Sequence, residues 1–189
     1  MHPALKKYLE GKICLSNQQE ELVNNHFTLR LTKRNELLVE KGAIARHLYF
    51  VCKGCLRIFL TNEDGSESTR YLIVEGQMGT ALPSFILNQP SVASIQSLSA
   101  AEVLTLSYAD RQLLFQHVPG WETMERIRLE LDYIASIQRL ESLITMNAKA
   151  RYDYFRQANP ALIQQLPAKI VADYMGISPE TLSRLKAKT

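Results

Sequence analysis

The chain has 189 residues, a formal net charge of +3 and 46% apolar residues, values typical of one medium globular domain together with a small one. No apolar run approaches the roughly eighteen residues of a membrane span. The first residues lack the apolar core of a signal peptide. We therefore expect a cytoplasmic protein without a membrane partner, and we exclude the membrane-spanning and the disulfide-rich secreted classes.

The first third of the chain changes from helical to strand-like patterning. Residues 3–25 are predicted to be helical, with Gly11 ending one helix and Ser16 capping the next. The first strand then places three apolar side chains on one face: Phe27, Leu29 and Leu31. Short strand-like runs separated by turn signals continue to residue 107. Their regular spacing predicts an antiparallel sandwich or barrel.

The three cysteines are Cys14, Cys52 and Cys55, and the last two have a C-x-x-C spacing. A metal or iron–sulfur site normally needs four ligands, and the sequence offers no second pair. The spacing also lies between predicted strands, whereas the redox version of the motif usually opens a helix. We expect both thiols to fill strand positions, with a redox or metal role as the alternative.

A long helix is predicted from Trp121 to Met146, after a short helix that begins at Tyr108. Apolar side chains recur along it at steps of three and four residues. This pattern is typical of a helix packed on its own domain or of a dimer seam. We predict a homodimer seam made by Ile127, Leu131, Ile134, Ile137, Leu140 and Ile144.

The C-terminal residues predict two short helices joined by a turn. Residues 168–174 form the first helix, and Gly176 can adopt a positive φ in the turn. Ser178 is a good N-cap for the second helix, and Pro179 suits its first position. The helices are expected to pack through Val171, Met175, Ile177, Leu182 and Leu185. This is a helix-turn-helix pattern, whose alternative is an ordinary helix pair that caps a domain.

The outer face of the second helix carries side chains suited to double-stranded DNA. Arginine can bond guanine in the major groove, glutamate can accept from cytosine, and lysine and serine suit phosphates. Residues 148–189 hold seven Lys or Arg and three Asp or Glu, so the positive excess of the chain lies there. The predicted DNA-binding residues are Ser178, Glu180, Thr181, Ser183, Arg184 and Lys188.

The order of strands, long helix and helix-turn-helix resembles the CRP/FNR family of bacterial transcription regulators. In the β part the resemblance rests on four short stretches, residues 40–42, 48–51, 53–57 and 64–65. In the C-terminal part, Gly176 to Arg184 is similar to the family's recognition helix. The resemblance implies a β-roll sensor, a homodimer on DNA, RNA polymerase as a further partner of an activator, and base contacts by Glu180 and Arg184. Pro179 departs from the polar residue that many members have there.

The resemblance also implies an effector pocket in the β-roll. Cyclic-nucleotide-binding members hold the ribose with a glutamate and the cyclic phosphate with an arginine. Residues 78–101 contain no Lys, Arg, Asp or Glu, so a buried phosphate would lack its charged partner. We expect an unknown small-molecule effector, or a filled pocket without one, rather than cyclic AMP. The predicted pocket residues are Gly79, Thr80, Ala81, Leu82, Ser84, Ser91 and Val92.

No cofactor is expected. The iron–sulfur members of the family use a cysteine cluster near the N-terminus, where this chain has Cys14 alone. An enzyme is not expected either, because the four histidines form no close pair and the chain lacks a G-x-S-x-G nucleophile motif and a glycine-rich nucleotide loop. The alternative function is a β-roll that binds a ligand or a protein and no longer binds DNA.

The predicted fold is α+β. An antiparallel β-roll, a jelly-roll-like double-stranded β-helix with N-terminal helices, occupies residues 1–118. A long dimerisation helix follows at residues 119–147. Residues 148–189 form a short helix-turn-helix domain, which is expected to lack the full β wing of the family because the sequence stops at Thr189.

Overall fold

The computed structural model describes residues 1–158 and 160–187. They form two compact units, Met1–Ile127 and Arg128–Thr189, with the division inside the longest helix. The fold is α+β, as predicted. The predicted domain boundaries at residues 118 and 147 remain predictions. Within the described residues, every helix is too short or too polar to cross a membrane.

Two helices precede the sheets. They are α1 (Pro3–Leu9) and α2 (Asn17–His26). Ser16 Oγ accepts a hydrogen bond from the Gln19 amide at 3.3 Å, and Gln19 Oε1 accepts one from the Ser16 amide at 2.9 Å. This reciprocal capping box fixes the start of α2, which confirms Ser16 as its cap.

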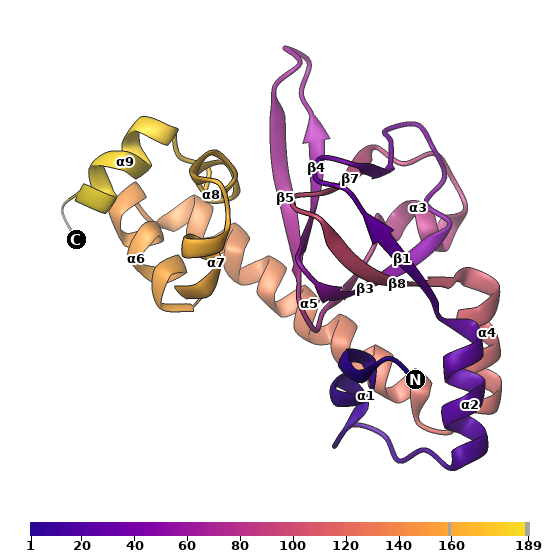
Figure 1. Ribbon diagram of the computed structural model, residues 1–189. Coiled ribbons are helices and arrows are strands. Elements are labelled where there is room, and N and C mark those ends of the chain that lie inside the picture. Colours follow the sequence, from indigo (N-terminus) through magenta and orange to yellow (C-terminus); the bar gives the residue numbers. More distant parts are fainter. Residues whose placement is uncertain (159, 188–189) are drawn as a thin grey trace. The chain divides into compact units, whose positions relative to one another are not determined.

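The β-roll consists of two four-stranded antiparallel sheets (Figure 1). The first has the order β1-β8-β3-β6 and the second the order β2-β7-β4-β5. The strands are β1 (Thr28–Thr32), β2 (Leu37–Val39), β3 (His47–Lys53), β4 (Cys55–Thr61), β5 (Glu67–Val74), β6 (Met78–Gly79), β7 (Ala93–Ser97) and β8 (Ala101–Ser107). The helix α3 (Leu82–Leu87) lies between β6 and β7 in the chain.

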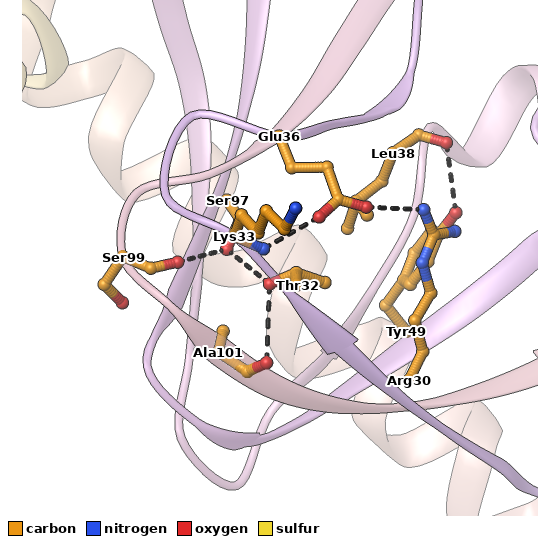
Figure 2. A network of polar contacts seen from close by, with 9 residues as sticks. All are labelled: Arg30, Thr32, Lys33, Glu36, Leu38, Tyr49, Ser97, Ser99 and Ala101. Atoms are coloured by element: carbon orange, nitrogen blue, oxygen red, sulfur yellow. Dashed lines mark hydrogen bonds and ion pairs between the residues drawn. The ribbon is translucent and has the colours of Figure 1, made fainter.

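The core of the β-roll is apolar, with Phe50, Ile73, Ile95 and Leu106 essentially inaccessible to solvent. A small polar network joins the two sheets at one end (Figure 2). Thr32 Oγ1 on β1 lies 2.9 Å from Ser97 Oγ on β7. Both hydroxyls are buried, and such groups are stable there only when hydrogen-bonded.

The alternating apolar side chains predicted for the first strand have unequal environments, and the first of them, Phe27, lies just before β1. Phe27 is buried, with its ring centroid 6.1 Å from that of Trp121. Leu29 and Leu31 follow at alternate positions but remain 51% and 70% exposed. The inward residue at the end of the strand is instead Thr32, whose hydroxyl joins the network with Ser97. Alternation therefore predicts the strand but not which of its faces is covered.

Helix α4 (Tyr108–His117) begins at the predicted residue and is capped by Ser107. It leads into α5 (Trp121–Thr145), which ends one residue before the predicted limit. Arg111 Nε donates to Glu125 Oε1 at 2.7 Å, and both side chains are buried. This ion pair fastens the first turns of α5 to α4.

The second unit contains residues 128–145 of α5 and four further helices (Figure 1). These are α6 (Ala148–Ala158), α7 (Pro160–Gln165), α8 (Ala168–Tyr174) and α9 (Pro179–Ala187). The sequence patterns above did not identify α6 and α7. In α6 the side chains of Tyr152 and Phe155 are buried.

Candidate functional site

The turn between α8 and α9 has a defined hydrogen-bond pattern. The Ile177 amide donates to the Ala172 carbonyl at 3.0 Å, and the Gly176 amide donates to the Asp173 carbonyl at 2.9 Å. Gly176 has φ +62°. This is a Schellman motif, in which a glycine in the left-handed region ends the helix. The predicted glycine turn is therefore present at the predicted position.

Helix α9 has a buried inner side and an open outer side. Leu182 is fully buried, as are Val171, Ala172 and Met175 of the preceding helix and turn. Leu185 and Ile177 are half-buried. Among the predicted DNA-binding residues, Ser178, Glu180, Ser183 and Arg184 are exposed and Thr181 is half-buried. Lys188 lies outside the described residues.

The first turn of α9 is held by its cap. Ser178 Oγ accepts from the Thr181 amide at 3.2 Å and lies 3.1 Å from the Thr181 hydroxyl. The backbone amide of Glu180 lowers the pKa of its own carboxyl, with smaller contributions from the Ser178 hydroxyl and the Arg184 charge. The outer face of the helix thus presents an ionised carboxylate and a guanidinium one turn apart.

Two arginines that the sequence patterns did not single out hold the turn of the helix-turn-helix. Arg139 of α5 donates to the carbonyl of Tyr174, the last residue of α8. Arg151 of α6 bonds three carbonyls at the end of α5 and reaches the Gly176 carbonyl at 3.5 Å. No local motif marks these arginines, because their acceptors are backbone carbonyls, and those of Tyr174 and Gly176 lie 35 and 25 residues away.

The predicted seam residues of α5 are open to solvent in the single chain. Their exposed fractions range from 38% for Ile137 to 73% for Ile144. We call this set the apolar stripe: Ile127, Leu131, Ile134, Ile137, Leu140 and Ile144. Six exposed apolar side chains on one helix are unusual for a surface that only water contacts.

The predicted effector segment uses its hydroxyl groups internally. Thr80 Oγ1 donates to the His47 carbonyl at 2.8 Å. Ser84 Oγ accepts from the Ala45 amide at 2.9 Å and donates to the Gln89 carbonyl at 2.6 Å. Ser91 Oγ donates to the Ala93 carbonyl and accepts from the Ala93 amide. These three side chains are buried and fasten loops of the β-roll to one another.

The remaining residues predicted for the effector pocket are apolar or lack a side chain. Ala81 is buried and half-buried Gly79 packs closely, since a Cβ on Gly79 would lie 2.6 Å from Ile73 Cδ1. Leu82 and Val92 are instead exposed, at 39% and 66%. The segment therefore offers no charged side chain to an anionic ligand, and its buried hydroxyls already have partners.

The C-x-x-C cysteines occupy strand positions on either side of Gly54. Cys52 lies in β3 and Cys55 in β4. Burial raises the pKa of Cys52 to about 11 and that of Cys55 to about 12. Both thiols are therefore protonated at neutral pH. Among the described residues, no group of three or more His, Cys, Asp or Glu side chains is placed to hold a metal ion.

Comparison with known proteins agrees with this architecture. Residues 29–117 match the family model of the cyclic nucleotide-binding domain. The structure superimposes on FixK2 from Bradyrhizobium japonicum with a TM-score of 0.74 at 13% identity, covering 86% of this chain and 83% of that one. For the regulator CLP of Xanthomonas campestris the TM-score is 0.72 at 17% identity, covering 92% and 91%. This chain shares the fold of these two proteins.

Another solved structure carries the family name itself. A protein from Eubacterium rectale that is assigned to the crp/fnr family of transcriptional regulators matches with a TM-score of 0.69 at 13% identity, covering 98% of this chain and 85% of that one. At these identities the structures establish the CRP/FNR-like fold. The predicted β-roll is thereby confirmed.

Two curated proteins share sequence with this chain at 28% and 26% identity. The potassium channel GORK of Arabidopsis thaliana is 28% identical over an alignment of 173 positions, which covers 82% of this chain and 21% of the channel. The potassium channel KOR1 of Oryza sativa subsp. japonica is 26% identical over an alignment of 200 positions, which covers 96% of this chain and 23% of the channel. The chain thus spans less than a quarter of the length of these relatives.

Proposed function

We propose that this protein is a transcription regulator that binds double-stranded DNA as a homodimer through α9. The observation that carries the proposal is the two-sided character of α9. Leu182 fastens its inner side to α8, while Glu180 and Arg184 lie exposed on its outer side. A helix held in this way can enter a major groove and present an ionised acceptor and a guanidinium to base edges.

A second copy of the chain is the proposed partner of the apolar stripe. The stripe extends over about five turns of α5, from Ile127 to Ile144. Steps of three and four residues allow two such helices to pack side by side. A two-fold dimer would also provide the paired recognition helices that bind successive major grooves about one DNA turn apart.

The proposed regulator does not respond to cyclic AMP. The segment where the family resemblance locates the cyclic phosphate has no cationic side chain. Its buried hydroxyls are bonded to the backbone of the β-roll. We propose an uncharged effector or none. CLP is described as responsive to c-di-GMP, so this dinucleotide belongs in the ligand panel with cyclic AMP and cyclic GMP.

DNA binding is tested by fluorescence anisotropy on duplexes selected from a random pool and on DNA from upstream of the protein's own gene. We expect the wild type to bind specifically and Arg184→Ala to lose about 1–3 kcal/mol of discrimination at one base position. Lys149→Ala is the matched control, because Lys149 is an exposed cation of the same unit that pairs with Asp153 on α6. Equal losses of DNA affinity in Arg184→Ala and Lys149→Ala would indicate nonspecific charge attraction instead.

The effector proposal is tested by thermal unfolding with each nucleotide. A ligand present at a hundred times its Kd stabilises a folded protein by about 2.7 kcal/mol. We expect no shift with cyclic AMP or cyclic GMP. A shift with either would contradict the proposal. Absence of DNA binding under every condition would favour the alternative of a ligand-binding or protein-interaction module.

A further inference from the structure

The turn of the helix-turn-helix is fastened to the end of α5 by three contacts inside the second unit. The first is made by Arg139. Its Nη2 and Nε donate to the Tyr174 carbonyl at 2.8 and 3.2 Å, and its guanidinium carbon lies 4.4 Å from the centroid of the Tyr174 ring. Carbonyls in the last turn of a helix have no partner within it, so Arg139 caps α8 with a charged donor.

The second contact is made by Arg151 on α6. Its Nη1 lies 3.2–3.3 Å from the carbonyls of Ser142 and Leu143 in the last turn of α5 and of Met146, the residue that follows α5. Its Nη2 lies 3.5 Å from the Gly176 carbonyl. One guanidinium therefore connects the end of α5 with the turn that precedes α9. A cation at the C-terminal end of a helix also interacts favourably with the helix dipole.

The third contact is steric. A Cβ built on Gly176 would lie 2.9 Å from Leu143 Cδ2, so the backbone of the turn passes directly over this side chain. Leu143, Arg139 and Arg151 contact the turn between α8 and α9 from α5 and α6. Arg139 thus makes a charged contact at Tyr174, and Arg151 makes a longer charged contact at Gly176. Leu143 adds an apolar contact beside Gly176.

We infer that Arg139 and Arg151 are positioning residues that fix the direction of the recognition helix α9 relative to the last turns of α5. This inference rests on the proposed function, because α5 carries the apolar stripe of the proposed dimer. Two α9 helices can meet half-sites of one spacing only if each is held at a constant angle to its own α5. When the contacts of Arg139 and Arg151 with the turn are removed, a smaller fraction of molecules has the competent geometry. The apparent Kd rises in inverse proportion to that fraction.

The positioning role of Arg139 is first tested without DNA. Spin labels are attached at Glu141→Cys on α5 and Ser183→Cys on α9, both exposed, in a Cys14→Ser background. Labelled chains are diluted into unlabelled protein, and the distance distribution is measured by double electron–electron resonance. We expect a narrow distribution for the wild type and a broad one for Arg139→Ala. Arg156→Ala is the matched control, since Arg156 pairs with Asp153 on α6 and has no bond to the turn. An unchanged width in Arg139→Ala would overturn the inference.

A second experiment measures the Kd for DNA duplexes that carry two half-sites, with the spacing between the half-sites varied one base pair at a time. The wild type is expected to bind one spacing strongly and the others weakly. Loss of a charged hydrogen bond should raise the Kd of Arg139→Ala at the best spacing by about tenfold and flatten the dependence on spacing. A merely structural loss would instead raise the Kd equally at all spacings, which would also overturn the inference.

A conservative variant separates positioning from folding. Arg139→Lys keeps the charge and the alkyl stem but loses the planar fork that bonds the Tyr174 carbonyl. We expect it to fold with an unchanged helical circular dichroism spectrum and to show intermediate widths and spacing dependence. If the wild type binds no duplex at all, the proposed function fails. The distance measurement still tests whether Arg139 fixes the direction of α9.

Discussion

The guanidinium of Arg139 bonds the backbone of Tyr174 and covers its ring at the same time, with the guanidinium carbon 4.4 Å from the ring centroid. The ring of Tyr174 also lies beside that of Phe155, whose centroid is 5.5 Å away. Tyr174 therefore joins α5 and α6 at the point where α8 ends. Burial raises the pKa of its phenol, so the ring is neutral at physiological pH.

The ring of Tyr174 is expected to contribute to stability mainly by packing. Tyr174→Phe keeps the carbonyl and the aromatic face, so we expect a change below about 1 kcal/mol. Tyr174→Ala removes the contacts with Phe155 and Arg139 and should cost about 2–3 kcal/mol, somewhat less than a fully buried aromatic ring. Urea unfolding followed by circular dichroism measures both. Equal effects would show that the hydroxyl group is the important part.

Gly176 should resist replacement for two separate reasons. A side chain at φ +62° is strained by about 1–2 kcal/mol, and the Cβ of alanine would also collide with Leu143. Gly11 is the matched control, because it has φ +73° but no heavy atom within 4 Å of a built Cβ. We expect Gly176→Ala to destabilise the protein more than Gly11→Ala in urea unfolding. Adding Leu143→Ala should recover part of the difference, and its failure to do so would contradict the steric explanation.

The dimer seam is tested by placing a charge in the apolar stripe. Ile137→Glu would bury a carboxylate between two α5 helices, so we expect a monomer in sedimentation equilibrium at concentrations where the wild type is a dimer. Ser136→Glu is the control on the same helix, because Ser136 is exposed and lies outside the stripe. A monomeric wild type, or equal behaviour of the two variants, would exclude this seam.

Asp110 links the start of α4 to the end of α2. Its carboxylate lies 2.6 Å from His26 Nδ1 and also accepts from the Ser107 hydroxyl. Burial raises the pKa of this carboxyl, but the hydrogen bonds from Ser107 and His26 outweigh it and hold the pKa below the ordinary value of 3.8. Because the folded pKa is the lower one, the stabilisation is present above pH 3.8 and is lost as the pH falls through the folded value.

Asp110→Asn should therefore weaken the loss of stability in acid. We expect the difference in urea midpoint between wild type and variant to be largest near neutral pH and to shrink below about pH 4. Unfolding curves at a series of pH values measure it. A difference that stays constant down to pH 2 would show that the carboxylate charge is unimportant.

The cysteines should differ sharply in reactivity. Cys14 is exposed, whereas the raised pKa values of Cys52 and Cys55, about 11 and about 12, leave almost no thiolate at pH 7.5. We expect Ellman's reagent to modify one thiol rapidly in the native protein and three in urea. Cys14→Ser should abolish the rapid phase. Fast modification of two thiols in that variant would support a redox role for the C-x-x-C pair.

Local sequence signals determined much of this fold. Ser16 and Ser178 predict the starts of their helices because an N-cap bonds amides only two or three residues away. Gly176 predicts the turn because few other residues adopt a positive φ without strain. The steps of three and four along α5 predict a long helix with one apolar stripe, since the period follows from helical geometry alone. Each of these signals depends on neighbours within a few residues.

Contacts between distant residues were decided only by the tertiary structure. Arg139 bonds the Tyr174 carbonyl, 35 residues away, and Arg151 bonds the Gly176 carbonyl, 25 residues away. The sequence around each arginine does not indicate these backbone acceptors. Thr80 and Ser84 are predicted to line a pocket, which stays a prediction, and the structure adds that their hydroxyls bond the backbone at His47 and Ala45. The sequence shows which kinds of group a polar side chain can hydrogen-bond. The packing of strands and helices determines which of those groups lies within bonding distance.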